Sequence, residues 1–248
     1  MTLVFVKDAF VPEEQATLDI NERGCRLGDG MFETMRITNG EVQCIEVHFK
    51  RIIKGLDRLL IKHQYLMDAL PEVIQALIDE NKVTDGFVRV GVSRGIGSVG
   101  WLPTMDGEPT LIVQTFLQKE LSSRSINLAF SDNIHVPGIG VKTLGAYTYI
   151  QASMEAASKN VDDVIMCNED GYVCETSCAN IFWQKHGVWY TPSLELGIID
   201  GVTRRVFMQQ EFVVEGFYTN EALQHADAIC VSNVRLGVVE GVIRSFAS

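Results

Sequence analysis

The sequence predicts a mixed α/β protein with helices and antiparallel strands in both halves of a 248-residue chain. Short apolar runs are joined by hairpin turns in each half, and segments with the three-and-four apolar spacing of amphipathic helices lie between them. A polar stretch without periodicity, 117–125, predicts a linker between an N-terminal domain, 1–116, and a C-terminal domain, 126–248.

The first half is expected to open with one strand over LVFVKDAFV, 3–11, followed by a glycine-rich loop. A strand over Phe32–Thr38 then leads into an Asn39-Gly40 turn and a second strand, because Asn-Gly between apolar runs is a hairpin signal. The remaining elements expected in this half are helices over 48–61 and 68–81 and strands over 87–94 and 110–116.

The second half is expected to contain two hairpins, which turn at Glu169-Asp170-Gly171 and at Lys185-His186-Gly187. One further strand is expected before these hairpins and one after them. Two helices are also expected, because their segments carry apolar residues at helical spacing. In chain order, the expected elements are a strand over 126–130, a helix over 149–159, hairpins over 163–175 and 180–192, a helix over 200–210 and a strand over 228–233.

A glycine pattern after the strand expected over 87–94 is excluded as a dinucleotide site. Gly95, Gly97 and Gly100 have the spacing G-x-G-x-x-G, which opens a helix in dinucleotide-binding folds. Here the chain continues with WLP and DGEP, which disfavour a helix. We therefore expect a glycine-rich turn that can still serve a substrate.

Composition and charge narrow the class of protein. The chain has 21 Lys and Arg against 32 Asp and Glu, a net charge of −11, which argues against a general nucleic-acid binder. No apolar run approaches the roughly 20 residues of a membrane helix, and the N-terminus lacks a signal-peptide layout. The six cysteines form no C-x-x-C pairs, so no metal site and no disulfide scaffold is expected. We expect a reduced, cytoplasmic protein.

Lys142 is the only formally charged residue between Asp132 and Glu155, and it lies in the apolar run GVKTLGAYTYIQA. A lysine whose stem is buried while its head reaches water is the structural alternative. A desolvated amine, however, becomes a nucleophile toward aldehydes. Pyridoxal phosphate is the commonest such aldehyde, and it also requires an anion site for its phosphate and a group facing its pyridine nitrogen.

Two segments supply candidates for those requirements. Glu175 is the only charged residue between Asp170 and Lys185, and an isolated carboxylate at a strand end suits a protonated pyridine nitrogen; capping of a turn is the alternative. The segment Asp200-Gly201-Val202-Thr203 opens a predicted helix, whose first N–H groups can bind phosphate; simple helix capping is the alternative.

Four further residues complete the candidate set. Arg51, on a predicted helix, adds a positive charge for the phosphate, with a solvated surface arginine as the alternative. Ser232 and Asn233 end a strand, where they can donate hydrogen bonds or simply form a turn. Tyr147 follows Lys142 by five residues and can reach the phenolic oxygen of the cofactor, or serve as a core tyrosine.

Taken in order along the whole chain, these segments resemble the fold-type-IV pyridoxal-phosphate enzymes, the class IV aminotransferase family. The matching segments are RLGDGMFETMR, VHFKRI, SRGIGSVGW, GVKTLG, DGYVCETSCANIFW, GIIDGVTRRV and ICVSNVRLGV. The resemblance implies an N-terminal α/β sandwich, a C-terminal pseudo-barrel and a homodimer, with pyridoxal 5'-phosphate in the cleft between the domains.

The resemblance also implies roles for individual residues. Lys142 would be the Schiff-base lysine and the general base, and Glu175 would be the partner of the pyridine nitrogen. The cofactor's phosphate would be held by Arg51, Gly201, Val202, Thr203, and Ser232 or Asn233.

Within this family, ETSCANIFW, SRGIGSVGW and SNVRLGV are most similar to 4-amino-4-deoxychorismate lyase, which gives 4-aminobenzoate and pyruvate for folate biosynthesis. Tyr147 and the segment GDGMFE look more like branched-chain and D-amino-acid aminotransferases. We therefore expect the lyase reaction, with a class IV aminotransferase acting on branched-chain or D-amino acids as the alternative. A non-catalytic carrier of the cofactor is the remote alternative.

For the small-molecule amino substrate, we expect Phe32 and Arg94 to be binding residues. Arg94 follows a predicted strand, and a guanidinium can grip a carboxylate of a dicarboxylate substrate bidentately. A solvated loop arginine is the alternative.

Overall fold

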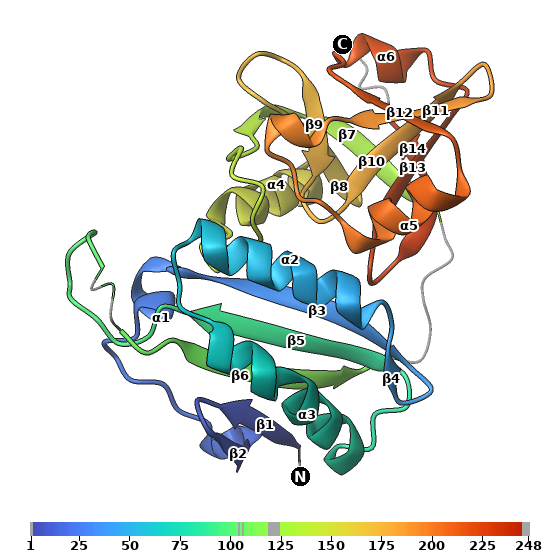
Figure 1. Ribbon diagram of the computed structural model, residues 1–248. Helices are drawn as coiled ribbons and strands as arrows, with labels where there is room; N and C mark the ends of the chain where they lie inside the picture. Colours follow the sequence, from blue (N-terminus) through green and yellow to red (C-terminus); the bar gives the residue numbers. More distant parts are fainter. Residues whose placement is uncertain (1, 104, 106, 119–124, 245–248) are drawn as a thin grey trace. The chain divides into compact units, whose positions relative to one another are not determined.

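The computed structural model describes residues 2–103, 105, 107–118 and 125–244, and its chain forms two compact units (Figure 1). The first unit comprises Met1–Glu120 and Val141–Ala146, and the second comprises Leu121–Gly140 and Tyr147–Ser248. The short segment that carries Lys142 therefore belongs to the first unit, although the chain on either side of it belongs to the second. Residues 119–124 of the predicted linker lie outside the described residues.

An antiparallel sheet forms the framework of the first unit, with its strands in the order β2-β1-β6-β5-β3-β4. β3 and β5 pair over eight residues, as do β5 and β6, so these three strands form the centre of the sheet. From Met31 onward, buried and half-buried residues alternate along β3, as expected for a strand with one face on a core. The strands are β1 (Leu3–Val6), β2 (Ala9–Pro12), β3 (Gly30–Thr38), β4 (Glu41–Val42), β5 (Gly86–Ser93) and β6 (Thr110–Leu117).

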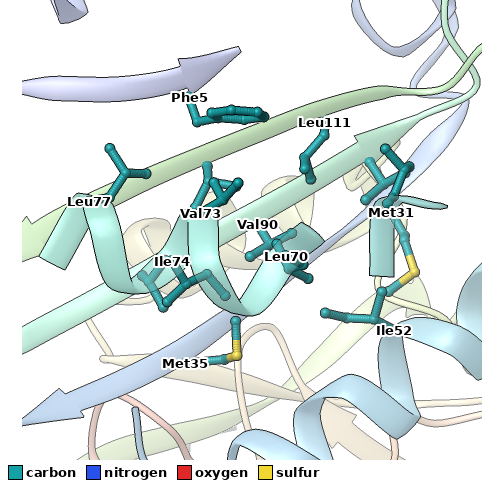
Figure 2. Packing of buried hydrophobic residues seen from close by; sticks show 14 of the residues in the cluster. Phe5, Met31, Met35, Ile52, Leu70, Val73, Ile74, Leu77, Val90 and Leu111 are labelled. Atoms are coloured by element: carbon teal, nitrogen blue, oxygen red, sulfur yellow. The ribbon is translucent and has the colours of Figure 1, made fainter. Parts of the chain in front are cut away.

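Helices α2 (Ile45–Arg58) and α3 (Gln64–Glu80) pack on one face of this sheet, and Figure 2 shows apolar side chains of the core between them. Ile52 and Leu56 of α2 and Leu77 of α3 are almost completely buried. Their three-and-four spacing places them on the inner face of each helix. This two-layer arrangement confirms the mixed α/β class for the first half.

Three local expectations in this unit had different outcomes. The Asn39-Gly40 hairpin turn is confirmed, with φ of 52° and 79° at its two residues, as a type I′ turn requires. The single strand predicted over 3–11 is wrong, because the chain reverses at Lys7, with φ of 61°, and forms the β1–β2 hairpin. The short helix α1 (Arg23–Leu27) lies where a glycine-rich loop was expected.

The glycine-rich segment after β5 forms no helix among the described residues between Arg94 and Pro109, as the sequence predicted. A buried arginine holds this segment in place. The Arg23 guanidinium donates to the carbonyl oxygens of Ser98, Gly100 and Trp101 at 3.0, 2.8 and 3.1 Å. The buried Arg23 side chain therefore fixes the backbone of this segment.

Six strands of the second unit close into a barrel, in the order β10-β13-β14-β7-β8-β9, because β9 also pairs with β10. The closing contact places Asn180 opposite Glu175. β11 extends the sheet beyond β10, and β12 pairs with β11. The expected C-terminal pseudo-barrel is therefore confirmed. The strands are β7 (Ile126–His135), β8 (Asp163–Cys167), β9 (Val173–Thr176), β10 (Asn180–Lys185), β11 (Val188–Pro192), β12 (Val213–Gly216), β13 (Ala228–Asn233) and β14 (Gly237–Ile243).

Helix α4 (Tyr147–Ser158) packs on β7 and β8 through Ala152 and Ala156, both buried. The other helices of this unit are α5 (Val202–Gln210) and α6 (Glu221–Gln224). The sequence did not predict β12, β14 or α6, which are short or lack a clear period. Among the described helices, none combines the length and the apolar character needed to cross a membrane.

The core between the first sheet and α3 gives a direct test of the first unit. Leu77 is fully buried, so Leu77→Ala should lower the free energy of unfolding by about 2–5 kcal/mol through lost transfer energy and a residual cavity. Leu117→Ala, at a site that is 69% exposed, should change it by less than about 0.5 kcal/mol. Urea unfolding monitored by circular dichroism measures both; equal effects would contradict the packing described here.

Candidate functional site

Lys142 lies in a loop that pairs with the start of β3. The Phe32 N–H donates to the Lys142 carbonyl oxygen at 2.8 Å, and the Leu144 N–H donates to the Gly30 carbonyl oxygen at 2.9 Å. The backbone from Lys142 to Leu144 is therefore held by a central strand of the first unit. The position of its side chain follows from the sheet, although the residue itself lies in a loop.

This loop comes very close to the end of α1. Gly28 ends that helix with φ of 67°, and a Cβ placed on it would lie 2.5 Å from the Cα of Gly145. A side chain at Gly28 would therefore collide with the backbone of the lysine loop as well as strain its own backbone. The glycine allows the loop to reach β3.

Two cationic side chains lie over one aromatic ring in the first unit. Lys142 Nζ is 4.6 Å from the centroid of the Phe32 ring, and Arg89 Cζ is 4.0 Å from the same centroid. Arg89 is exposed on β5, whereas Val88 and Val90 on either side of it are buried. Arg89 was not predicted from the sequence, although a single arginine among the apolar residues of FVRVGV is a usable signal.

Arg51 is oriented by a buried acid, Glu33 of β3. Arg51 Nε donates to Glu33 Oε2 at 2.7 Å, Nη2 donates to Oε1, and His48 Nδ1 lies 3.2 Å from Oε1. Burial alone would raise the pKa of Glu33, but the charge of Arg51 and the contacts with His48 and Arg51 outweigh it and lower that pKa to about 2. Glu33 is therefore ionised and fixes the guanidinium, and the phosphate role expected for Arg51 stays a prediction.

Arg94 has a structural environment that argues against the predicted substrate-binding role. Its Nε donates to Asp29 at 2.9 Å, and its two terminal nitrogens donate to the carbonyl oxygens of Leu60 and Leu59 at 2.9 and 2.7 Å. The residue is 9% exposed. These contacts tie the loop after β5 to the end of α2, and the substrate-binding roles expected for Arg94 and Phe32 stay predictions.

Glu175 of β9 is 3% exposed, and its carboxylate accepts hydrogen bonds on both oxygens. The Tyr149 hydroxyl donates to Oε1 at 2.9 Å, and the Ile199 N–H donates to Oε2 at 3.0 Å. The Asn180 side-chain amide also donates to Oε2, at 3.3 Å. These donors compensate the loss of water around a buried carboxylate.

Asn180 connects Glu175 with two other parts of the second unit. Its amide donates to the Ile199 carbonyl oxygen at 2.8 Å, and its backbone pairs with Ser232 across β10 and β13. A Cβ placed on Gly201 would lie 2.1 Å from Asn180 Oδ1. The segment before α5 and the buried acid therefore meet at the amide side chain of Asn180, and the end of β13 pairs with its backbone.

The start of α5 and the end of β13 offer donors to an anion. Gly201 precedes the helix and makes no side-chain cap, and the first N–H groups of a helix have no partner within it. The Ser232 hydroxyl is buried and has no hydrogen-bond partner among the described residues. A phosphate would be a suitable partner for either kind of donor, and the phosphate roles expected for Gly201, Val202, Thr203 and Ser232 stay predictions.

The two remaining predicted residues have different surroundings. The Asn233 side chain accepts from the N–H groups of Arg235 and Leu236 at 2.9 and 2.8 Å, so it forms the turn that was its structural alternative. Tyr147 begins α4 and is 69% exposed. The roles expected for Asn233 and Tyr147 toward the cofactor stay predictions.

Tyr149 and Asn180 were missed by the sequence analysis. Both lie in segments that it singled out, two residues after Tyr147 and five residues after Glu175. Their polar groups became recognisable only when the structure placed them on the carboxylate.

A model of the family described as amino-transferase class IV matches residues 30–242. Aminodeoxychorismate lyase of Bacillus subtilis (strain 168) is 29% identical, over 96% of this chain and 85% of the relative. D-alanine aminotransferase of Staphylococcus epidermidis is 27% identical, over 96% of this chain and 88% of the relative. The branched-chain aminotransferase of Thermoproteus uzoniensis, crystallised with norvaline, has the same fold, with a TM-score of 0.90 and 23% identity over 98% of this chain and 87% of that one.

This chain belongs to the class IV aminotransferase family. Enzymes of this family depend on pyridoxal 5'-phosphate, and this chain is accordingly a pyridoxal-phosphate-dependent enzyme. Its residues fit that cofactor. The first unit offers the Lys142 amine. The second offers a buried acid, the Ser232 hydroxyl, which has no hydrogen-bond partner among the described residues, and the N-terminus of α5, where Gly201 provides no side-chain cap.

The buried acid of the first unit predicts a specific dependence of stability on pH. Because the pKa of Glu33 is about 2 in the folded chain and 4.5, its ordinary value, in the unfolded chain, its ionised form stabilises the fold above pH 4.5. This contribution of about 3 kcal/mol should be lost as pH falls from about 4.5 to about 2. Urea unfolding of the wild type and Glu33→Gln at several pH values measures it.

The Glu33→Gln protein should be less stable at pH 7 and should lose less stability on acidification than the wild type. Glu72→Gln, at an exposed position of α3, is the matched control and should follow the wild-type curve. An acid-induced loss in Glu33→Gln that equals the wild-type loss would show that another group is responsible.

Proposed function

We propose that this member of the class IV aminotransferase family is a 4-amino-4-deoxychorismate lyase, which converts its substrate into 4-aminobenzoate and pyruvate. The observation that carries this assignment is the B. subtilis relative of that name, at 29% identity over 96% of this chain. The segments ETSCANIFW and SRGIGSVGW point to the same reaction. We further propose that the enzyme is a cytoplasmic homodimer, as the resemblance to this family implies.

The residues proposed to hold the cofactor have complementary chemical properties. Lys142 binds its aldehyde, and Glu175 faces its ring nitrogen. The N–H groups of Val202 and Thr203, the Ser232 hydroxyl and the Arg51 guanidinium hold its phosphate. When bound, the cofactor supplies an electron-withdrawing ring that stabilises negative charge on the carbon next to the substrate nitrogen.

Arg89 is the residue that we propose for a substrate carboxylate. Its guanidinium and the Lys142 amine both contact the Phe32 ring. A carboxylate bound to the guanidinium would therefore lie in the same region of the first unit as the amine. A guanidinium also suits a planar carboxylate better than a lysine ammonium does. Arg89 therefore takes the place of Arg94 in the proposed site, and Phe32, whose ring lies near both cations, contacts the substrate.

Lys142 is the proposed proton carrier. With the cofactor bound, the amine of Lys142 would remove the proton from the carbon that bears the substrate nitrogen. The bond between the ring carbon and the enolpyruvyl oxygen then breaks, and the ring becomes aromatic. Lys142 returns its proton to the departing enolpyruvate, which leaves as pyruvate, so the reaction needs no oxidant and no water.

A second reaction on the same residues is supported by a separate observation, the 27% identity to D-alanine aminotransferase of S. epidermidis over 96% of this chain. In an aminotransferase acting on D-amino or branched-chain amino acids, Lys142 would remove and return the same proton, and one water molecule would supply the oxygen of the keto acid that leaves. The two reactions diverge according to whether a good leaving group is next to the deprotonated carbon.

A substrate assay on the purified holoenzyme separates these reactions. We expect 4-aminobenzoate, detected by its fluorescence, from aminodeoxychorismate, and no keto acid from D-alanine, L-leucine or L-glutamate. Lys142→Ala should lower the rate by about 10²–10⁴-fold because it removes the proton carrier. Lys54→Ala, at an exposed position of α2, should retain wild-type activity.

Keto-acid formation from an amino acid, without 4-aminobenzoate, would replace the lyase by the aminotransferase. A yellow wild-type protein that shows neither activity, with Lys142→Ala giving the same result in both assays, would overturn both the lyase and the aminotransferase. The protein would then be a non-catalytic carrier of the cofactor.

The proposed phosphate site can be tested apart from the reaction. Ser232→Ala should raise the dissociation constant for pyridoxal 5'-phosphate by about tenfold, because it removes one donor to a charged group. Binding of pyridoxal, which lacks the phosphate, should be unchanged. Ser158→Ala, at the exposed end of α4, is the control. An equal effect of Ser232→Ala on both ligands in fluorescence titrations of the apoenzyme would place the phosphate elsewhere.

A further inference from the structure

The two oxygens of the Glu175 carboxylate are bound by different kinds of donor. Oε2 accepts from the Ile199 backbone N–H and from the Asn180 amide, which belong to the same network as the start of α5. Oε1 accepts from the Tyr149 hydroxyl, which comes from helix α4. Because the Tyr149 phenol comes from a helix, its hydroxyl can be removed by mutation without altering the strand pairing around Glu175.

Tyr149 is held in place by more than its hydroxyl. Its ring packs against the apolar cluster between α4 and the barrel, which includes Ala152 and Val164. Its carbonyl oxygen accepts from the Ser153 hydroxyl at 3.0 Å. The hydroxyl is thus presented to Glu175 by a fixed backbone and a packed ring.

The titratable groups next to this carboxylate stay neutral over the physiological range. Burial, and then the negative charge of Glu175, raise the pKa of the Tyr149 phenol well above its ordinary value of 10.0. Burial and the same charge raise the pKa of the Cys174 thiol to about 12. Tyr149 therefore remains a donor, and Cys174 adds no second negative charge beside the acid.

We propose that Tyr149 is a positioning residue that keeps the shared proton on the ring nitrogen of the cofactor and away from Glu175. This inference rests on the proposed role of Glu175 as the partner of that nitrogen. A carboxylate and a pyridine nitrogen compete for one proton, and a hydrogen bond donated to the carboxylate stabilises its ionised form. The phenol on Oε1 shifts that competition toward the protonated ring, which is the better electron acceptor.

The position of this proton can be measured on the holoenzyme. Wild type, Tyr149→Phe and Glu175→Gln are loaded with pyridoxal 5'-phosphate labelled with ¹⁵N in the ring, and the nitrogen resonance is recorded at one pH. Tyr149→Phe should move the resonance from the protonated toward the neutral ring. It should also lower kcat by about tenfold, with KM changed less than twofold, since only the electron-accepting step is affected.

Tyr172→Phe is the matched control, because Tyr172 packs against the same apolar cluster and its ring contacts Phe217. It should leave the resonance and kcat at their wild-type values. If Tyr149→Phe does not fold, 3-fluorotyrosine at this position preserves the shape and strengthens the donor, and the resonance should then move further toward the protonated ring.

The variants Tyr149→Phe, Glu175→Gln and Tyr172→Phe together distinguish failure of the role proposed for Tyr149 from failure of the proposed function. A wild-type resonance in Tyr149→Phe, together with a shifted resonance in Glu175→Gln, would overturn the role of Tyr149 alone. A wild-type resonance in both variants would show that Glu175 does not face the ring nitrogen, and the proposed arrangement of the cofactor would be wrong. A shift in Tyr172→Phe equal to that in Tyr149→Phe would reduce the effect to packing.

Discussion

The hydrogen bonds between the lysine loop and β3 are the contacts on which the proposed chemistry most depends. Lys142 lies in a segment of six residues that joins the first unit while the chain around it belongs to the second. The bonds from Phe32 and Leu144 place the backbone of that segment against a central strand, and Gly28 leaves room for it. The amine is therefore positioned by a sheet that is formed mostly by residues far from it in sequence.

The enzyme stabilises two buried glutamates in different ways. Glu33 is bound by a guanidinium, and this pair fixes Arg51 on α2. Glu175 receives hydrogen bonds from a phenol, a backbone N–H and an amide, all neutral groups. Neutral donors stabilise a carboxylate without bringing a countercharge, so they suit the role proposed for Glu175, which is to face a cationic ring. The same residue type thus serves structure in one unit and the proposed chemistry in the other.

Several parts of the fold and site could be predicted because they depend on local sequence. The amphipathic spacing of α2, the Asn39-Gly40 turn and the isolation of Lys142 and Glu175 among apolar residues are all visible within short windows. The β1–β2 hairpin was missed because Lys7 adopts a positive φ that a lysine seldom takes. The contacts of Arg94 could not be predicted because its carbonyl partners, Leu59 and Leu60, are more than thirty residues away.

By itself, the sequence determined the mixed α/β class, the family and the two residues on which the cofactor proposal centres, Lys142 and Glu175. Only the tertiary structure decided which side chains surround them. Asn180 contacts Glu175 because the barrel closes between β9 and β10, and Tyr149 reaches it because α4 packs on that barrel. The physical reason is that strand register and helix packing bring together groups whose separation in sequence carries no signal, whereas apolar periodicity and turn chemistry act over a few residues.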